Sequence, residues 1–356
     1  MTYISNPWRG TGVPAQSSLA AGEVTVDDSL VLKLLGQCPA HAQTPLTDLP
    51  ALAARLGIGS LHVKDERARM GLGSFKALGA AFSIAKTAFE RVGQDISDPQ
   101  KAKIALEGHV FVTASAGNHG LSVAAGAHVF GATAVIYLAE TVPSGFAQRL
   151  RDKGAEVVVV GADYEASMAA AAKAATQNGW RLLSDSTWVE DTSGRDVMEG
   201  YLALSAEVFE QYGPAPTHIY LQAGVGGLAA AVAASARKHW GQDVQIIVVE
   251  PDAAPALLAS IQAGKPVATQ GPASNMGRLD CKEPSHLALK ALARDADGFL
   301  TLSDSDVARD IAQLAGFGLQ TSPSGGAGFA GVVAQAASLG PQARVLVILS
   351  EGPADD

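Results

Sequence analysis

The sequence predicts an α/β protein in which mainly parallel sheets are flanked by helices. Short β-branched runs alternate with alanine-rich segments of helical periodicity, as is typical of parallel strands joined by helical crossovers. Many of the 38 glycines fall where a strand-like run gives way to a helix-like one, which indicates strand–turn–helix units. The chain has 356 residues, about twice the usual size of one domain, so we expect two lobes or one large domain.

Six apolar runs have the composition of buried parallel strands. They are residues 109–115, 133–139, 156–161, 217–224, 244–251 and 344–352. Four segments between them have the composition of helices, namely residues 120–130, 143–153, 164–178 and 227–239. Polar and charged residues cluster at 90–107 and 188–195, which we interpret as crossings between two lobes, and residues 264–278 have the composition of a loop.

Composition and charge exclude several classes of partner. Apolar residues make up 47% of the chain and charged residues 17%, which is enough apolar material for a sizeable core. The net charge is −9, so we expect no nucleic-acid partner. No apolar run reaches the ~18 residues of a membrane span, and the N-terminus lacks a signal-peptide pattern. For these reasons we expect a cytoplasmic protein without a membrane partner. Cys38 and Cys281 show no metal-ligand spacing, so we expect no metal site.

The first motif that could carry chemistry is Lys76 within 74-SFKALGA-80, at the start of an alanine-rich helical pattern. Burial disfavours the charged form of a lysine, and the neutral amine can then form a Schiff base or accept a proton. The alternative is a lysine that faces solvent on a surface helix, as most lysines do.

The second motif, 113-TASAGNHG-120, lies between a predicted strand and a predicted helix. Small residues at a helix N-terminus expose backbone N–H groups, and the helix dipole favours an anion there. We therefore expect a carboxylate-binding loop in which Asn118 and His119 could orient a ligand. An ordinary helix-capping turn is the alternative.

The third motif, 222-QAGVGGLA-229, again follows a strand and precedes an apolar helix. Its glycines would let backbone amides approach a phosphate closely. The same residues match G-x-G-x-x-A, and Glu250 ends the next strand where a dinucleotide fold has its ribose-binding acid. An NAD-dependent dehydrogenase is therefore an alternative, although such a fingerprint usually opens its domain.

Two further residues follow strand-like runs, where site residues of α/β proteins gather. Asp185 comes after a short apolar run, and a helix cap is its alternative role. Ser350 lies at the carboxyl end of the last predicted strand.

The order of these motifs resembles that of the fold-type II enzymes that depend on pyridoxal-5′-phosphate (PLP). Within that family, several longer segments are similar to those of the diaminopropionate ammonia-lyases, namely 64-KDERARMGLGSFKALGAAF-82, 218-HIYLQAGVGGLA-229, 247-IVVEPD-252 and 348-ILSEG-352. The resemblance covers most of the chain and implies two lobes, each with a mainly parallel twisted sheet flanked by helices. It implies a large PLP-binding domain of residues 1–98 and 188–356 and a small domain of residues 99–187.

The resemblance also implies a role for each matched residue. Lys76 would bind PLP as a Schiff base. Asp185 would serve an L-substrate either as the base for the Cα proton or as a group that positions the leaving substituent. The other matched residues would surround the cofactor. Phe75 would lie beside its ring, Asn118 at its phenolic oxygen and Ser350 at its pyridine nitrogen. The residues at its phosphate would be Gly224, Val225, Gly226 and Gly227. The substrate carboxylate would lie on the loop formed by Ser115, Ala116, Gly117, Asn118 and His119.

The function that the resemblance implies is β-elimination on a small L-amino acid such as 2,3-diaminopropionate, by a homodimer, to give a 2-oxo acid and ammonia. The family's acid that serves the D-isomer is replaced here by Ala116, so we expect a preference for the L-isomer. Cys281 matches one of the family's paired cysteines, but its partner is missing, so we expect no disulfide there.

Two other functions stay open at this point. The loop 113-TASAGNH-119 is similar to that of threonine and serine dehydratases, so serine, threonine or 3-hydroxyaspartate are alternative substrates. A catalytically silent binding protein with the same fold is the other alternative, although the retained Lys76 argues against it.

Overall fold

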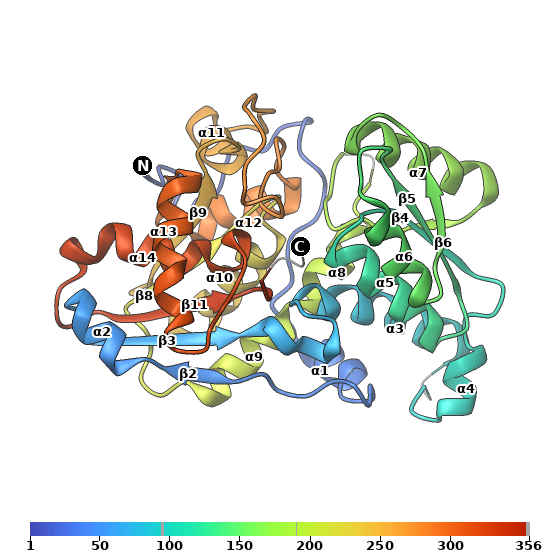
Figure 1. Cartoon of the computed structure of the whole chain (residues 1–356), viewed down its shortest axis with the longest axis horizontal. Helices are drawn as coiled ribbons and strands as arrows, with labels where there is room; N and C mark the ends of the chain where they lie inside the picture. The colour runs from blue at the N-terminus through green and yellow to red at the C-terminus, as the bar shows by residue number, and fades with distance from the viewer. Residues whose placement is uncertain (94–95, 190, 354–356) are drawn as a thin grey trace.

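The computed structural model describes residues 1–93, 96–189 and 191–353 and has two lobes side by side (Figure 1). The larger lobe is built around a seven-stranded sheet and the smaller lobe around a four-stranded sheet, as far as the described residues show. The predicted α/β architecture with mainly parallel sheets is therefore confirmed.

The larger sheet has the strand order β1-β10-β9-β8-β11-β3-β2. Its inner strands are parallel, and the edge strands β1 and β2 run antiparallel to their neighbours. The strands are β1 (Thr2–Ser5), β2 (Leu46–Asp48), β3 (Ser60–Asp65), β8 (His218–Gln222), β9 (Gln245–Pro251), β10 (Gly298–Leu302) and β11 (Arg344–Leu349).

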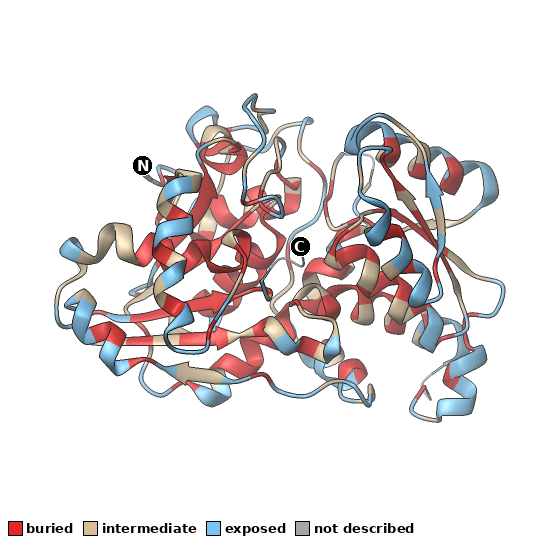
Figure 2. Ribbon diagram, in the orientation of Figure 1, coloured by how far each residue is buried: buried red, intermediate tan, exposed pale blue. Residues whose placement is uncertain are grey.

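Helices cover both faces of the larger sheet. Along β8, Ile219 and Leu221 belong to one apolar cluster and Tyr220 to another, because successive side chains of a strand point to opposite faces. Buried residues concentrate in these inner strands and on the helices that cover them (Figure 2). The elements are α1 (Ser29–Leu35), α2 (Pro50–Leu56), the 3₁₀ helix η1 (Glu66–Gly71), α9 (Leu202–Gln211), α10 (Gly227–Trp240), α11 (Ala256–Ala263), α12 (His286–Asp295), α13 (Asp304–Ala315) and α14 (Pro323–Leu339).

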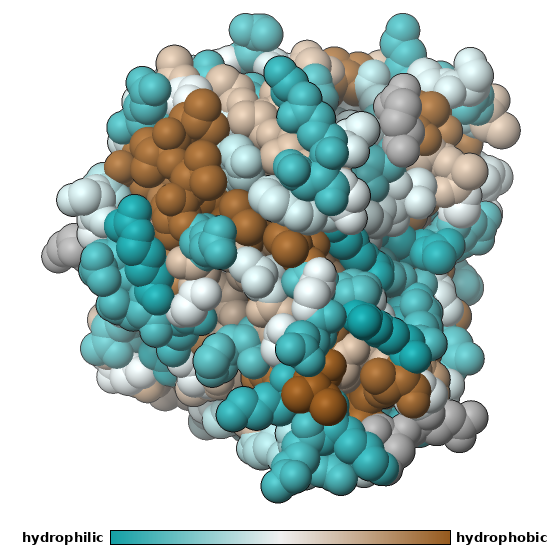
Figure 3. All heavy atoms as spheres, turned by 90° about the vertical axis from the view of Figure 1, so that its right-hand side faces the viewer, coloured by the Kyte–Doolittle hydropathy of each residue, from teal (hydrophilic) through white to brown (hydrophobic). Residues whose placement is uncertain are grey.

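The smaller sheet is parallel throughout and has the order β6-β5-β4-β7. Its elements are α4 (Pro99–Ile104), β4 (Val110–Ala114), α5 (Asn118–Val129), β5 (Thr133–Leu138), α6 (Ser144–Asp152), β6 (Glu156–Val159), α7 (Tyr164–Asn178) and β7 (Arg181–Leu182). Figure 3 looks onto the outer side of this lobe, where apolar side chains gather in patches among polar ones. On the edge strand β6, Val158 and Val159 are exposed.

Two helices, α3 (Lys76–Val92) and α8 (Gly194–Gly200), join the lobes. Helix α3 packs against both α5 and α8. It crosses α8 at a pair of glycines, since a β-carbon added at Gly200 would lie 2.7 Å from the Cα of Gly79. This close crossing anchors the beginning of α3, where Lys76 lies.

Most elements predicted from the sequence lie within one to three residues of their expected ends. Strands β1, β2, β3 and β10 were not predicted; β1 and β2 are short edge strands, and β3 carries Lys64 and Asp65. Strand β7 overlaps the short apolar run noted before Asp185. The loop at 264–278 is confirmed. In the expected crossings at 90–107 and 188–195, residues 94–95 and 190 lie outside the described residues. No helix within the described ranges is long and apolar enough to cross a membrane.

Candidate active site

Lys76 is the first residue of α3 and lies beside the carboxyl end of β11. The backbone N–H of Phe75 donates to the carbonyl of Ser350 at 3.0 Å, and Ser74 forms a β-bridge with Glu351. These backbone contacts join the start of α3 to the end of β11. Lys76 and Ser350, which are far apart in the sequence, are therefore neighbours.

The ammonium group of Lys76 donates a hydrogen bond to the carboxylate of Asp185, and both side chains are largely buried. Burial would raise the pKa of Asp185, but the charge of Lys76 and the hydrogen bond from its ammonium group outweigh burial and hold this pKa well below its ordinary value. Burial likewise opposes the charge of Lys76, and Asp185 raises the lysine pKa above its ordinary value. The pair is therefore ionic at neutral pH. The expectation that burial lowers the pKa of Lys76 is wrong for the free side chain, because Asp185 stabilises the ammonium group more than burial opposes it.

This contact argues against two alternatives from the sequence. Lys76 is not a surface lysine on an exposed helix face, because its side chain is largely buried and is paired with the carboxylate of Asp185. Asp185 does not cap a helix, because the next helix, α8, begins only at Gly194.

The loop from Ser115 to His119 connects β4 to α5, with Gly117 at the N-cap. The side-chain amide of Asn118 donates to Oε2 of Glu351 at 2.5 Å. His119 is buried, and its Nε2 donates to the carbonyl of Leu183 at 2.8 Å. This hydrogen bond directs the ring toward the protein interior. Burial lowers the pKa of His119, so the ring is neutral.

The glycine loop connects β8 to α10 and has the geometry of an anion cradle. Gly226 has φ +99°, a left-handed conformation that favours glycine. A β-carbon at Gly224 would lie 2.9 Å from the Sγ of Cys281 and 3.1 Å from the carbonyl oxygen of Arg278, so only glycine fits at this position. The N–H groups of the first turn of α10 have no partner within the helix, and this turn has no acidic residue. The loop therefore fits a phosphate.

The cradle and the lysine belong to one region. A β-carbon at Gly227 would lie 3.6 Å from the ring of Tyr201 and 3.9 Å from the carbonyl oxygen of Asp185. The rings of Tyr201 and Phe75 lie 4.8 Å apart between centroids. The residues predicted around the cofactor thus gather at the carboxyl edge of the larger sheet, next to the smaller lobe.

Sequence reasoning missed two residues of this region, Glu351 and Arg278, and did not place Cys281 beside the glycine loop. Glu351 accepts hydrogen bonds from Asn118 and Ser322, and its place directly after Ser350 could have indicated it. Arg278 lies 3.7 Å from Glu351, but no local pattern marks it. Cys281 adjoins Gly224, and burial raises the pKa of its thiol to about 12. Both cysteines are free, as expected.

Glu250 does not support the dehydrogenase alternative. Its buried carboxyl group accepts hydrogen bonds from the backbone N–H groups of Leu257 and Leu258 at 2.7 and 2.8 Å. The side chain is thus occupied at the start of α11 and does not face a ribose site.

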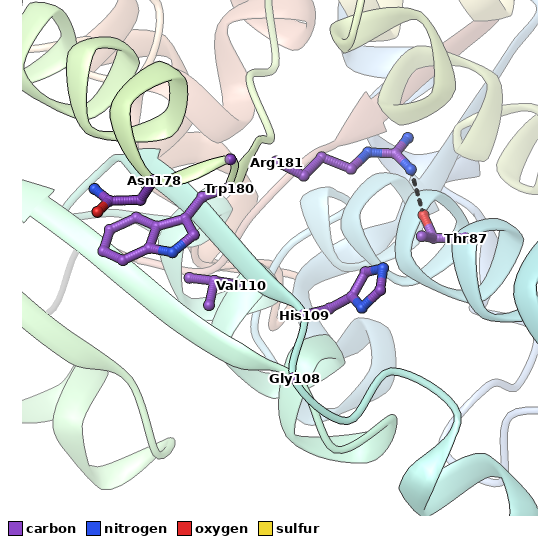
Figure 4. Close-up of a pocket in the computed structure, with 8 residues that line it drawn as sticks. Thr87, Gly108, His109, Val110, Asn178, Trp180 and Arg181 are labelled. Atoms are coloured by element: carbon purple, nitrogen blue, oxygen red, sulfur yellow. Dashed lines mark hydrogen bonds between the residues drawn. The ribbon is translucent and has the colours of Figure 1, made fainter.

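A hollow of roughly 380 Å³ lies on the smaller lobe, at the opposite edge of its sheet (Figure 4). Val110 at the start of β4 lines it, whereas the loop from Ser115 follows the end of β4. Arg181 reaches across it and donates to Thr87 at 2.6 Å. This hollow is therefore separate from the region around Lys76.

Residues 38–351 match the family model of the pyridoxal-phosphate dependent enzymes. The chain belongs to this family. It is 34% identical over 318 residues to the diaminopropionate ammonia-lyase of Salmonella typhimurium, covering 85% of this chain and 78% of the relative. It is 36% identical over 278 residues to the Escherichia coli enzyme of the same name, covering 74% and 69%.

The solved structures agree with these relatives. The crystal structure of the E. coli diaminopropionate ammonia-lyase in complex with D-serine matches with a TM-score of 0.86 and 29% identity, covering 99% of this chain and 93% of that chain. The predicted fold-type II architecture, the PLP cofactor and the enzyme class are thereby confirmed. This chain is a PLP-dependent lyase of the ammonia-lyase type, which acts by β-elimination.

Proposed function

We propose that this PLP-dependent lyase acts on a small L-amino acid such as 2,3-diaminopropionate and releases a 2-oxo acid and ammonia. The observation that carries this proposal is the contact between Lys76 and Asp185 beside the glycine loop. It joins an amine that can bind a carbonyl cofactor to a carboxylate that can accept a proton.

In this proposal the chain holds PLP through residues from four segments. Lys76 binds the cofactor covalently, Gly224 to Gly227 bind its phosphate through backbone amides, and Phe75 packs beside its ring. Asn118 donates to its phenolic oxygen and Ser350 faces its pyridine nitrogen. Bound PLP withdraws electrons from the substrate Cα and so makes the Cα proton acidic.

Asp185 and Lys76 share the proton transfers of the reaction. The carboxylate of Asp185 accepts the Cα proton of the L-substrate, and the amine of Lys76 returns a proton to the departing β-amino group. Their direct hydrogen bond supports this division, because a proton can pass between the two groups without a water molecule.

The loop from Ser115 to His119 binds the substrate carboxylate at the N-terminus of α5. The preference for an L-substrate rests on Ala116. This residue has no proton-accepting group, so Asp185 is the base proposed for the Cα proton.

The test is a screen of L- and D-diaminopropionate, serine, threonine and 3-hydroxyaspartate for release of a 2-oxo acid. We expect the highest kcat/KM with L-diaminopropionate and a visible absorbance band of bound PLP. A higher kcat/KM with an L-hydroxyamino acid would show that the enzyme is a dehydratase of hydroxyamino acids and not a diaminopropionate lyase. Release of no 2-oxo acid from any of these compounds would overturn the proposal.

We also propose a homodimer in the cytoplasm, with a large domain of residues 1–98 and 188–356 and a small domain of residues 99–187. All strands of the four-stranded sheet fall within residues 99–187, which supports this division. The molar mass from light scattering after size-exclusion chromatography tests the dimer, and the mass of a monomer would contradict it.

A further inference from the structure

Arg278 extends over the loop that we propose for the substrate carboxylate. A β-carbon added at Gly117 would lie 3.2 Å from the guanidinium carbon of Arg278 and 3.3 Å from its Nε. The absence of a side chain at Gly117 therefore leaves the space in which the guanidinium lies. Because Gly117 caps α5, the guanidinium and the N-terminus of this helix present positive charge to the same place.

The backbone of Arg278 is held by two parts of the larger lobe. Its N–H donates to the hydroxyl of Ser324 at 3.0 Å, at the start of α14. Its carbonyl oxygen lies 3.1 Å from the position of a β-carbon added at Gly224. The side chain thus starts beside the glycine loop of the larger lobe and ends over a loop of the smaller lobe.

The guanidinium of Arg278 has N–H groups that are available to bind a ligand. Its ion pair with Glu351 is loose, with 3.7 Å between Nε and Oε2, and the side chain is 39% exposed. Glu351 already accepts closer hydrogen bonds from Asn118 and Ser322. Within the described part of the chain, the side chain of Arg278 makes no hydrogen bond. Buried Arg237, in contrast, bonds through all three of its guanidinium nitrogens.

We propose that Arg278 binds the α-carboxylate of the amino-acid substrate and completes the site that the loop from Ser115 to His119 begins. A guanidinium offers two parallel N–H donors that match the two oxygens of a carboxylate. The loop would bind the carboxylate from the smaller lobe and Arg278 from the larger one. The substrate carboxylate then accepts hydrogen bonds from the N–H groups of Arg278 that do not contact Glu351. This inference rests on the proposed function, because it deepens the substrate site of that reaction.

The first experiment measures binding to the PLP-loaded enzyme by calorimetry with two probes that lack a β leaving group. L-Alanine has the α-carboxylate, whereas L-alaninol has a hydroxymethyl group in its place. In Arg278→Met we expect L-alanine to bind about 10- to 100-fold more weakly, the range for loss of a charge-assisted hydrogen-bond pair, and L-alaninol to bind as before. Arg278→Lys should recover part of the loss.

Arg195→Met is the matched control. Arg195 also forms a loose ion pair, 3.7 Å from Glu199, and its side chain is 46% exposed, but it lies on α8. This variant should bind both probes as the unmodified enzyme does. Equal affinity of Arg278→Met and the unmodified enzyme for L-alanine would overturn the proposal.

The second experiment compares steady-state constants for L-diaminopropionate and L-3-hydroxyaspartate. Arg278→Met should raise KM for both by a similar factor and change kcat by less than about threefold, because uniform binding is lost. A rise confined to the dicarboxylic substrate would overturn the assignment to the α-carboxylate. If no amino acid is turned over but the two probes still differ, the proposed reaction fails and the carboxylate site stands.

Discussion

Lys76 and Asp185, 109 positions apart in the sequence, form a partly buried ion pair in which the ammonium donates to the carboxylate. Helix α3 provides the lysine, and the segment after β7 provides the aspartate. Lys86, further along α3, forms a second ion pair of similar burial with Asp196 of α8, at 2.7 Å. We propose no role in cofactor or substrate binding for the second pair, so its residues offer matched controls for the first.

Lys76→Ala should abolish the visible absorbance band of bound PLP, because no other amine is proposed to bind the cofactor covalently. The measurement is the spectrum of the purified protein, followed by borohydride reduction and peptide mapping. The control, Lys86→Ala, should keep the band. A cofactor label on a lysine other than Lys76 would contradict the assignment.

Asp185→Asn should lower kcat by about 10² or more, since it keeps the size of the side chain but removes the proton-accepting oxygen. The cofactor spectrum and the melting temperature should change little. Asp196→Asn, which removes the partner of Lys86, should keep normal turnover. If Asp185→Asn retains full activity with the best L-substrate, Lys76 is left as the candidate base.

Gly226→Asp should weaken PLP binding, because φ +99° disfavours a side chain and an added β-carbon would lie 3.1 Å from the side chains of Ala288 and Leu257, so the loop would have to shift. The variant also adds a negative charge to the loop proposed for the phosphate. The PLP dissociation constant of the variant checks this. Gly226→Ala separates strain from charge and should have the smaller effect. Gly340→Asp, at a positive φ in open space, should bind PLP normally. An unchanged constant for Gly226→Asp would show that the phosphate lies elsewhere.

Turnover of the L-isomer should exceed that of the D-isomer by more than about tenfold, because a general base contributes about 10² to 10⁴ in rate and Ala116 offers none. Stereospecific kcat/KM values for diaminopropionate measure this. Ala116→Asp should raise D-isomer turnover, whereas Ala116→Asn, of the same size, should not. Comparable kcat/KM values for the two isomers in the unmodified enzyme would disprove the preference.

Glu250 should contribute a loss of stability as pH rises from about 5 to 8. Burial raises the pKa of this carboxyl to about 8, although two backbone N–H groups oppose the rise. In this window the folded protein holds a proton that the unfolded chain has released, so the free energy of unfolding decreases with pH. Glu250→Gln cannot titrate and should reduce this slope in denaturant titrations, whereas exposed Glu165→Gln should not. An identical slope in Glu250→Gln would refute the assignment.

The alternation of strands and helices could be predicted from the sequence because it depends on local periodicity and turn chemistry. Helix α7 has the bounds that its pattern predicts, Tyr164–Asn178. The glycine loop and the lysine motif could be identified for the same reason, since each lies at a junction between a strand or turn and a helix. The roles of these residues stay predictions until they are tested.

Strand β3 shows where local patterns fail. It carries Lys64, which a sequence pattern treats as exposed, but this side chain is fully buried and donates to Glu207 at 2.6 Å. The partner comes from α9, more than a hundred residues later. A charge can be buried there because folding provides the opposite charge.

The sequence by itself determined the α/β class, the glycine loop and the position of Lys76, because each depends on residues that are close along the chain. Only the tertiary structure decided that Asp185 contacts Lys76 and that Arg278 covers Gly117. These contacts join segments from different elements and from both lobes. They depend on how the two sheets and α3 pack, and side-chain packing between distant segments leaves no periodic signal in either of them.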